Sequence, residues 1–243
     1  MDDEFDQLLK NLRLYRIRAV LDDRLRSASA DGPSYSNFLL HLFREEHHSQ
    51  QERFLEHRIK RAKLPEKWPL ETFPWELQPG VNRSQIEELS GLDFIGHGSN
   101  LVFIGPTGVG KTGLASGILL KALYTGRRCQ FVKAQDLFDD LFRSLADHSS
   151  RKLLDRMIRI EVLLIDELGY LNIRPEQSNM FFKLMEERYT RGLSTLITTN
   201  LDYTEWYGFL GQKPMVSALL DRLRHRCVTL SIDGPSLRRP ISI

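Results

Sequence analysis

The chain has 243 residues, of which 41% are hydrophobic and 27% charged, and its formal net charge at pH 7 is +2. These values are typical of a globular protein with one full α/β domain and a smaller attachment. No apolar run approaches the roughly 20 residues of a membrane-spanning helix, and the acidic start does not resemble a signal peptide. We therefore expect a cytoplasmic protein. A net charge this small does not by itself indicate a nucleic-acid partner.

Residues 1–64 are predicted to form a small, all-α N-terminal domain. Apolar side chains such as Leu8, Leu12 and Tyr15 recur at three- and four-residue spacing, with charged residues between them. The segment Asp31-Gly32-Pro33-Ser34 is expected to separate two helical stretches.

A linker is predicted over residues 65–81. Four prolines occur there, interleaved with aromatic side chains: Pro65, Trp68, Pro69, Phe73, Pro74, Trp75 and Pro79. Proline at this density excludes an α-helix and favours an extended segment. Because the aromatic side chains need burial, we expect the linker to pack along the domain that follows.

Residues 82–243 alternate between strand and helix patterns. Five strands are predicted, at Leu101–Ile104, Cys129–Lys133, Val162–Asp166, Thr195–Thr199 and Cys227–Ile232. Helices are predicted around residues 84–92, 111–124, 135–147, 151–159 and 175–191, with further pieces within 202–226. This alternation predicts an α/β domain with a five-stranded parallel sheet covered on both faces.

A phosphate-binding loop follows the first strand and opens a helix. The run fits the pattern G-x-x-x-x-G-K-[ST] with Gly105, Pro106, Thr107, Gly108, Val109, Gly110, Lys111 and Thr112. Its glycines allow successive backbone N–H groups to point at a phosphate, and the helix N-terminus adds partial positive charge. We expect Lys111 to reach the β- and γ-phosphates of ATP and Thr112 to offer its hydroxyl to Mg²⁺.

Polar residues end two of the predicted strands. Asp166 and Glu167 follow an apolar run, so Asp166 is expected to orient Mg²⁺ while Glu167 acts as the general base on water. Asn200 follows Thr195–Thr199 and is expected to hold that water near the γ-phosphate. The alternatives are a surface acid pair and a plain turn asparagine. A P-loop kinase acting on a small molecule is a further alternative, which the glutamate disfavours.

Together these features resemble an AAA+ ATPase. In that family one additional strand, here Cys129–Lys133, is inserted in the sequence between the P-loop strand and the acidic strand. The resemblance implies that Asn200 is the sensor 1 residue. It also implies that Arg222, in Ser217-Ala218-Leu219-Leu220-Asp221-Arg222-Leu223, is an arginine finger acting on a neighbouring subunit's ATP. Arg224 and Arg226 are close enough to leave that assignment open.

Several segments narrow the resemblance to the IstB group, the ATPase helpers of insertion-sequence transposases, which are related to DnaC helicase loaders. The segments are Phe73–Pro79, Ile86–Leu89, Phe94-Ile95, the P-loop, Met180–Tyr189 and Ile232–Arg238. The resemblance implies a homo-oligomer that assembles on duplex DNA with ATP and recruits a partner transposase. There are two alternatives. One is a DnaC-like helicase loader, and the other is a nucleotide-gated scaffold in which hydrolysis serves only to time the assembly.

Too few residues follow the arginine-finger segment for the usual C-terminal lid of AAA+ proteins, so Arg238 is a candidate for the cationic contact that a lid supplies elsewhere. Candidate DNA contacts are Lys152 and Arg156 between two strands, and Arg58, Lys60 and Arg61 near the end of the N-terminal helices. No base-reading motif accompanies them. We therefore expect phosphate contacts with little sequence preference, a solvated helix face being the alternative for each residue.

Overall fold

The computed structural model describes residues 3–169, 172–211 and 214–238. The chain divides into two compact units, Met1–His57 and Arg58–Ile243, each with a hydrophobic core of its own. The division falls inside a helix, ahead of the predicted boundary between residues 64 and 65, so the linker of residues 65–81 lies within the second unit. None of the described helices is long and apolar enough to cross a membrane.

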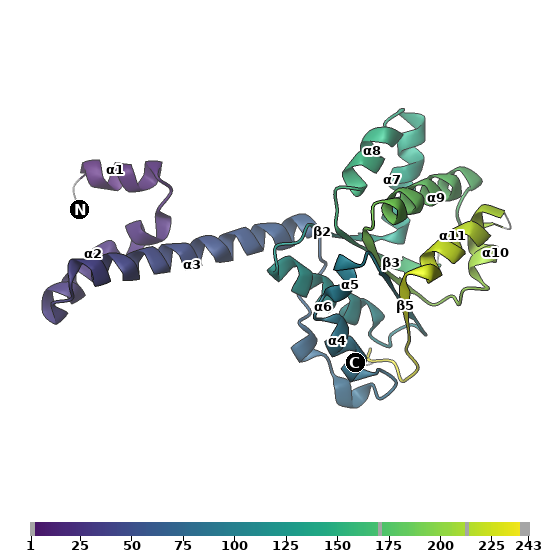
Figure 1. Ribbon diagram of the computed structural model, residues 1–243, viewed down its shortest axis with the longest axis horizontal. Helices are drawn as coiled ribbons and strands as arrows, with labels where there is room; N and C mark the ends of the chain where they lie inside the picture. The colour runs from purple at the N-terminus through teal and green to yellow at the C-terminus, as the bar shows by residue number, and fades with distance from the viewer. Residues whose placement is uncertain (1–2, 170–171, 212–213, 239–243) are drawn as a thin grey trace, which may run out of the picture. The chain divides into compact units, whose positions relative to one another are not determined.

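The first unit is built from three helices, drawn from purple to blue in Figure 1: α1 (Asp3–Asn11), α2 (Tyr15–Asp31) and α3 (Tyr35–Ala62). The predicted break at residues 31–34 is confirmed, with Gly32 in the left-handed conformation after α2. A second break, which we did not predict, lies between α1 and α2, where Arg13 has a φ of 58°. The core of this unit joins all three helices through Leu9, Ile17, Leu21 and Leu42.

The N-terminus of α2 is capped by a side chain from another helix. Leu14 precedes α2 and offers no side-chain cap. Instead Glu46 of α3 accepts hydrogen bonds through Oε2 from the backbone N–H groups of Arg16, at 2.7 Å, and Ile17, at 2.9 Å. Its Oε1 accepts from Arg53 at 3.0 Å. Glu46 is only 2% exposed, so this carboxylate ties two helices together from inside the unit.

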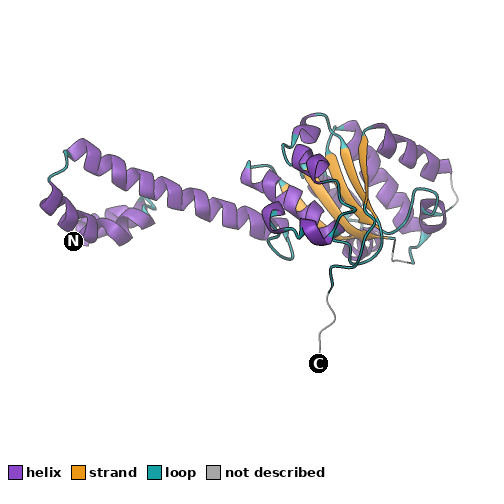
Figure 2. Ribbon diagram, turned by 90° about the horizontal axis from the view of Figure 1, so that it is seen from below, coloured by secondary structure: helices purple, strands orange, loops and turns teal. Residues whose placement is uncertain are grey.

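The second unit contains a five-stranded parallel sheet, drawn in orange in Figure 2. Its strands are β1 (Asn100–Ile104), β2 (Cys129–Lys133), β3 (Val162–Leu168), β4 (Ser194–Thr199) and β5 (Cys227–Ser231). The order is β2-β3-β4-β1-β5, and every pair is parallel. All five predicted strands are therefore confirmed. Because β4 lies between β1 and β3, the carboxyl ends of these three strands are adjacent.

Helices cover both faces of this sheet (Figure 2). The helix α6 (Lys111–Tyr124) packs on one face against four of the strands. The opposite face buries Val102, Leu163, Ile165 and Ile197 against a second set of helices. These are α7 (Ala134–Ala146), α8 (Ser150–Met157), α9 (Pro175–Thr190), α10 (Trp206–Leu210) and α11 (Pro214–His225).

Two predictions about local structure were incomplete. The helix expected over residues 84–92 is divided into α4 (Arg83–Leu89) and α5 (Asp93–Gly96), with Leu92 at a φ of 70° between them. The linker is not extended throughout, because it contains two 3-10 turns, η1 (Leu70–Thr72) and η2 (Trp75–Leu77). A proline precedes each turn, and its fixed φ is compatible with the start of a helical turn.

We predict that Glu46→Ala lowers the free energy of unfolding of the first unit by about 2–3 kcal/mol, because two buried N–H groups and Arg53 lose their acceptor. Glu46→Gln keeps one acceptor oxygen and should cost less. Urea unfolding followed by circular dichroism measures both. An unchanged free energy of unfolding in Glu46→Ala would show that the cap contributes nothing.

Protonation of Glu46 at low pH should remove the same contribution of its hydrogen bonds to the stability of the first unit. Burial opposes ionisation of Glu46, but the hydrogen bonds from Ile17, Gln50, Arg16 and Arg53 outweigh it and hold the pKa below its usual value of 4.5. The stabilisation is therefore present above about pH 4.5 and is lost as the pH falls through the lowered pKa. The difference between wild type and Glu46→Ala should shrink over that range.

Candidate functional site

The P-loop connects β1 to α6 and is shaped by its glycines. Gly108 and Gly110 have φ angles of 88° and 96°, a region that side chains rarely adopt. Space is also limiting: a Cβ on Gly108 would lie 2.2 Å from the Oγ of Ser236, and one on Gly110 would lie 2.7 Å from the ring of Phe73. The loop is therefore held from outside by both the linker and the segment after β5.

Lys111 points into the concave side of the loop. Its Nζ donates to the backbone oxygens of Gly105 and Pro106, both at 2.7 Å. Burial lowers the pKa of Lys111, the positive charge of Arg238 lowers it further, and the carboxylates of Asp166 and Glu167 oppose the shift. A partly buried cation beside the P-loop backbone is suited to binding a phosphate.

Asp166 lies at the centre of the site. Its Oδ1 accepts a hydrogen bond from Thr112 Oγ1 at 2.8 Å and another from Thr198 Oγ1 at 2.5 Å. Asp166 is 3% exposed, and this burial raises its pKa, while the two hydroxyl groups oppose the rise. The hydroxyl of Thr112 and this carboxylate are oxygen donors of the kind that Mg²⁺ prefers. The described residues therefore fit a magnesium ion.

Glu167 stands at an irregular point of β3. We predicted that the strand ends at Asp166, but it continues to Leu168, and its register with β4 shifts between Ile165 and Leu168. Glu167 takes a φ of 60°, and its backbone N–H donates to Thr198 Oγ1 at 2.9 Å. The exposed side chain is thereby aimed into the pocket beside the P-loop.

Asn200 follows β4 next to the acidic pair. Its Oδ1 is buried and has no hydrogen-bond donor among the residues that the structure describes. It lies 3.1 Å from the position that a Cβ on Gly169 would take, immediately after β3. The amide is thus close to the end of the acidic strand, but Asn200 is not among the described residues that line the P-loop pocket.

The P-loop lines an open pocket of about 570 Å³, a volume suited to a nucleotide-sized ligand. Its walls combine polar loop residues with the linker and the chain end: Trp68, Pro69, Leu70, Thr72, Phe73, Pro74, Thr107, Gly108, Gly110, Lys111, Thr112, Gly113, Glu167, Thr199, Leu237 and Arg238. We predicted that the linker packs on the following domain, and this is confirmed. Its contribution to the pocket was not foreseen.

Arg238 reaches this pocket through the segment after β5. The N–H of Leu237 donates to the oxygen of Gly108 at 2.9 Å, which draws the segment across the P-loop. The exposed side chain of Arg238 lines the pocket together with Glu167 and Lys111. Within the described chain, residues 232–238 after β5 contain no helix.

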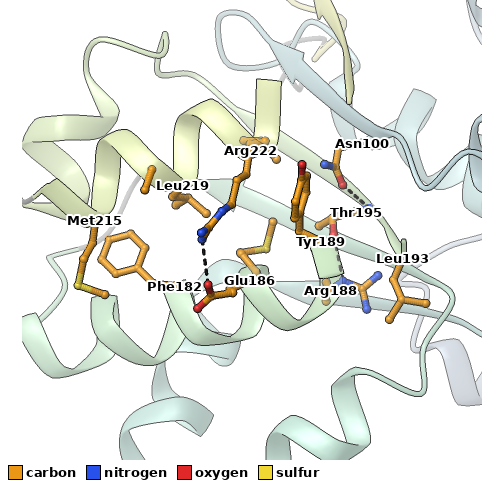
Figure 3. A pocket seen from close by; sticks show the side chains of 13 residues that line it. Asn100, Phe182, Glu186, Arg188, Tyr189, Leu193, Thr195, Met215, Leu219 and Arg222 are labelled. Carbon is orange, nitrogen blue, oxygen red and sulfur yellow. Dashed lines mark hydrogen bonds and ion pairs between the residues drawn. The ribbon is translucent and has the colours of Figure 1, made fainter. Parts of the chain in front are cut away.

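Arg222 lies elsewhere, in the groove between α9 and α11 shown in Figure 3. It lines a pocket of about 210 Å³ together with Asn100 and Thr195, which stand at the starts of β1 and β4. Its Nη1 is 3.1 Å from Glu186 Oε1, an ion pair marked by a dashed line in Figure 3. Arg222 is thus at the amino edge of the sheet, whereas the P-loop is at the carboxyl edge.

The two neighbouring arginines make different contacts. Arg224 lies over the ring of Tyr203, at 5.2 Å, and Arg226 over the ring of Tyr189, at 5.8 Å. Of the three, Arg222 alone is paired with a carboxylate among the described residues. None of the three lines the P-loop pocket.

The candidate DNA-contacting residues are on helix surfaces. Lys152 and Arg156 lie four residues apart on the exposed side of α8, and Arg156 is 3.8 Å from the carboxylate of Asp140. On the last turns of α3, Lys60 and Arg61 are exposed and Arg58 is half-buried. The predicted two-helix insertion between β2 and β3 is confirmed as α7 and α8.

Thr198 is a site residue that the sequence did not reveal. Its hydroxyl is the only group described that contacts both Asp166 and the backbone of Glu167. A threonine next to the last residue of a strand has no distinctive pattern. Only the strand order, with β4 beside β3, would have identified it.

Comparisons with known proteins agree with this geometry. A family model for IstB-like ATP binding proteins matches residues 7–242. An ATP-binding protein of insertion sequence IS21 from Pseudomonas aeruginosa is 33% identical over 235 residues, which are 97% of this chain and 88% of the relative. One of insertion sequence IS5376 from Geobacillus stearothermophilus is 35% identical over 211 residues, 87% of this chain and 84% of the relative. The crystal structure of the DnaC helicase loader shares the fold, with a TM-score of 0.55 and 24% identity over 71% of this chain and 97% of that one.

We predict that Thr198→Val lowers kcat for ATP hydrolysis by about 10–100-fold, since loss of the hydroxyl removes one of the two hydrogen bonds to Asp166 and leaves the Glu167 N–H without its acceptor. Thr198→Ser keeps the hydroxyl and should stay near wild type. Steady-state phosphate release and fluorescent-nucleotide binding separate catalysis from affinity.

Thr195→Val is the matched control. It removes another buried hydroxyl of β4, one that accepts from Arg188 at the opposite edge of the sheet. It should lower stability and leave kcat nearly unchanged. If Thr195→Val and Thr198→Val reduced kcat equally, the effect of Thr198 would be one of general stability.

Proposed function

The chain belongs to the family of IstB-like ATP-binding proteins and is an ATP hydrolase with an AAA+ fold, and from this premise we propose that it assembles on duplex DNA with ATP bound between subunits. We further propose that the assembly recruits or activates a partner transposase in the bacterial cytoplasm. The observation that carries the proposal is the separation of Arg222 from the P-loop pocket. In this proposal one copy of the chain cannot complete the catalytic site, whereas two copies can.

The phosphates of ATP would bind in the cradle of Gly105–Thr112. In this proposal Lys111 exchanges the backbone oxygens of Gly105 and Pro106 for β- and γ-phosphate oxygens. The apolar wall formed by Trp68, Phe73 and Leu237 is suited to a purine ring.

Thr112 and Asp166 would hold Mg²⁺, directly or through water. When bound, the ion neutralises negative charge on the phosphates. Thr198 keeps the carboxylate of Asp166 in place, and the burial of that carboxylate limits its freedom to rotate. Both effects orient the oxygen donors before the ion binds.

Glu167 would accept the proton of the attacking water, and Asn200 would orient that water. The pocket-facing side chain of Glu167 and the unpartnered Oδ1 of Asn200 support these roles. A water held by a carboxylate and an amide favours hydrolysis over phosphate transfer to a small molecule. A P-loop kinase activity is therefore the weaker hypothesis.

Arginines would approach the nucleotide from two subunits. Arg238 lines the pocket of its own chain and is suited to contact the phosphates in cis. Arg222, at the opposite edge of the sheet, is suited to reach the ATP of a neighbouring copy, where it would neutralise charge in the transition state. Its ion pair with Glu186 would have to open for that contact.

Duplex DNA would be bound through phosphate contacts. Lys152 and Arg156 on α8 are exposed and spaced for neighbouring phosphates, and Arg58, Lys60 and Arg61 form a second basic cluster. Such contacts depend steeply on salt and read little sequence. The insertion-sequence relatives favour a role in transposition, while the fold shared with the DnaC helicase loader favours helicase loading as the second candidate.

We predict that Lys111→Ala prevents ATP-dependent assembly on duplex DNA, because the phosphates lose their cation. Glu167→Gln should stabilise the assembly, since ATP still binds while hydrolysis slows by about 10²–10⁴-fold. Analytical ultracentrifugation with duplex DNA measures both variants. If both variants assembled on duplex DNA like the wild type, control of assembly by ATP would be ruled out. If the wild-type protein preferred single-stranded DNA and captured a replicative helicase, the helicase-loader function would be favoured.

Mixing two inactive variants tests the shared site. Arg222→Ala alone should reduce hydrolysis by about 10³-fold or more, and Glu167→Gln should also be inactive. In mixed assemblies some interfaces combine an intact Glu167 with an intact Arg222, so activity should return. Arg224→Ala is the matched control and should hydrolyse ATP alone. A mixture that stays inactive, although the two variants co-assemble, would contradict a finger acting between subunits.

A further inference from the structure

Gln78, in the linker, lies at the point where three segments of the second unit meet. It is 1% exposed. Its Nε2 donates to the oxygen of Val109 in the P-loop at 3.0 Å and to the oxygen of Pro235 after β5 at 3.1 Å. Both partners are carbonyl oxygens, so the two hydrogens of one amide nitrogen satisfy two backbone acceptors from distant parts of the chain.

The segment Ile232–Arg238, which we term the strap, is packed closely against the linker. A Cβ on Gly234 would lie 1.8 Å from the Oε1 of Gln78, and one on Gly80 would lie 1.5 Å from the oxygen of Asp233. Glycine at both positions therefore permits an approach that a side chain would block.

The strap also follows the P-loop strand and the loop itself. The N–H of Ile232 donates to the oxygen of Ile104 at 2.8 Å, and the N–H of Leu237 donates to the oxygen of Gly108 at 2.9 Å. Between these two bonds, Gln78 supplies the side-chain hydrogen bond to Pro235. Arg238 comes directly after the last of these anchors and lines the P-loop pocket.

From this geometry we infer that Gln78 is a positioning residue for ATP binding, which fixes the strap against the P-loop so that Arg238 faces the phosphates. The inference deepens the proposed function and rests on the cis role of Arg238 in it. Gln78 itself does not touch the pocket among the described lining residues, so it acts through the strap.

Glutamine suits this junction because its amide nitrogen supplies both donor hydrogens. An ionised glutamate would place a carboxylate oxygen against two carbonyl oxygens, and a leucine would leave both carbonyls unpaired. Methionine has a similar length without a donor. Gln78→Met should therefore free the strap while preserving the volume of the side chain.

A double-mutant cycle tests this inference through the affinity for a fluorescent, non-hydrolysable ATP analogue. Arg238→Ala should weaken binding by about tenfold in the wild-type background. Gln78→Met should weaken it by roughly five- to tenfold, because two hydrogen bonds that hold the strap are lost. In the Gln78→Met background, Arg238→Ala should cost about twofold or less, since Arg238 is no longer held over the phosphates.

Gln177→Met is the matched control. Gln177 is also a buried glutamine whose Nε2 donates to a backbone oxygen, that of Phe138 at 3.0 Å, and it does not line the P-loop pocket. It should lower the melting temperature as Gln78→Met does while keeping the affinity for the analogue. If Gln78→Met does not fold, Gly234→Ala displaces the same amide from the strap side and should give the same loss of coupling.

The inference is overturned if Arg238→Ala costs the same factor with and without Gln78, or if Gln78→Met binds the analogue as tightly as Gln177→Met. In either case the wild-type protein still binds ATP, and the proposed function stands. If Arg238→Ala leaves wild-type affinity unchanged, the cis role of Arg238 fails, and the inference fails with it.

Discussion

One carboxylate oxygen, Oδ1 of Asp166, joins the parts of the chain from which the ATP site is built. It accepts a hydrogen bond from Thr112 at the start of α6 and another from Thr198 in β4. The P-loop strand β1 and the acidic strand β3 are not neighbours, so β4 must lie between them for these groups to meet. Because Asp166 is buried, losing either bond leaves its carboxylate with one hydrogen-bond donor fewer in a low-dielectric site, which is costly.

The same constraint explains the position of Glu167. The hydroxyl of Thr198 binds the carboxylate of Asp166 and also accepts the backbone N–H of Glu167, which holds β3 in its irregular register. A regular strand would turn the glutamate to the face opposite Asp166. The left-handed backbone at Glu167 instead lets both acids serve one edge of the sheet. Strain of this kind is typical of functional positions.

Local patterns predicted much of this molecule. The P-loop was identifiable because its glycines, lysine and threonine follow a fixed spacing, and the bounds of Cys129–Lys133 were predicted to the residue. The contacts of Glu46, Thr198 and Gln78 were not predictable. Each joins residues that are about 30 or more positions apart, and none of the three residue types marks such a contact by itself. The 3-10 turns of the linker were missed because a high density of prolines excludes an α-helix but does not distinguish an extended segment from short 3-10 turns.

Two arginines, Arg238 and Arg222, lie at opposite edges of the same sheet. Arg238 is held near the P-loop by the strap, and Arg222 is at the far edge, paired with Glu186. In the proposed function a monomer therefore presents half of a catalytic site at each edge. In the proposed function ATP joins such edges, and the assembly on DNA depends on that junction.

The most direct measurement of this claim is a cryo-electron microscopy structure of the protein on duplex DNA with a non-hydrolysable ATP analogue. We expect the guanidinium of Arg222 within hydrogen-bonding distance of the γ-phosphate bound by the neighbouring copy, with its bond to Glu186 broken. An assembly in which Arg222 stays paired with Glu186, and each analogue is contacted by one subunit alone, would contradict a catalytic site shared between subunits.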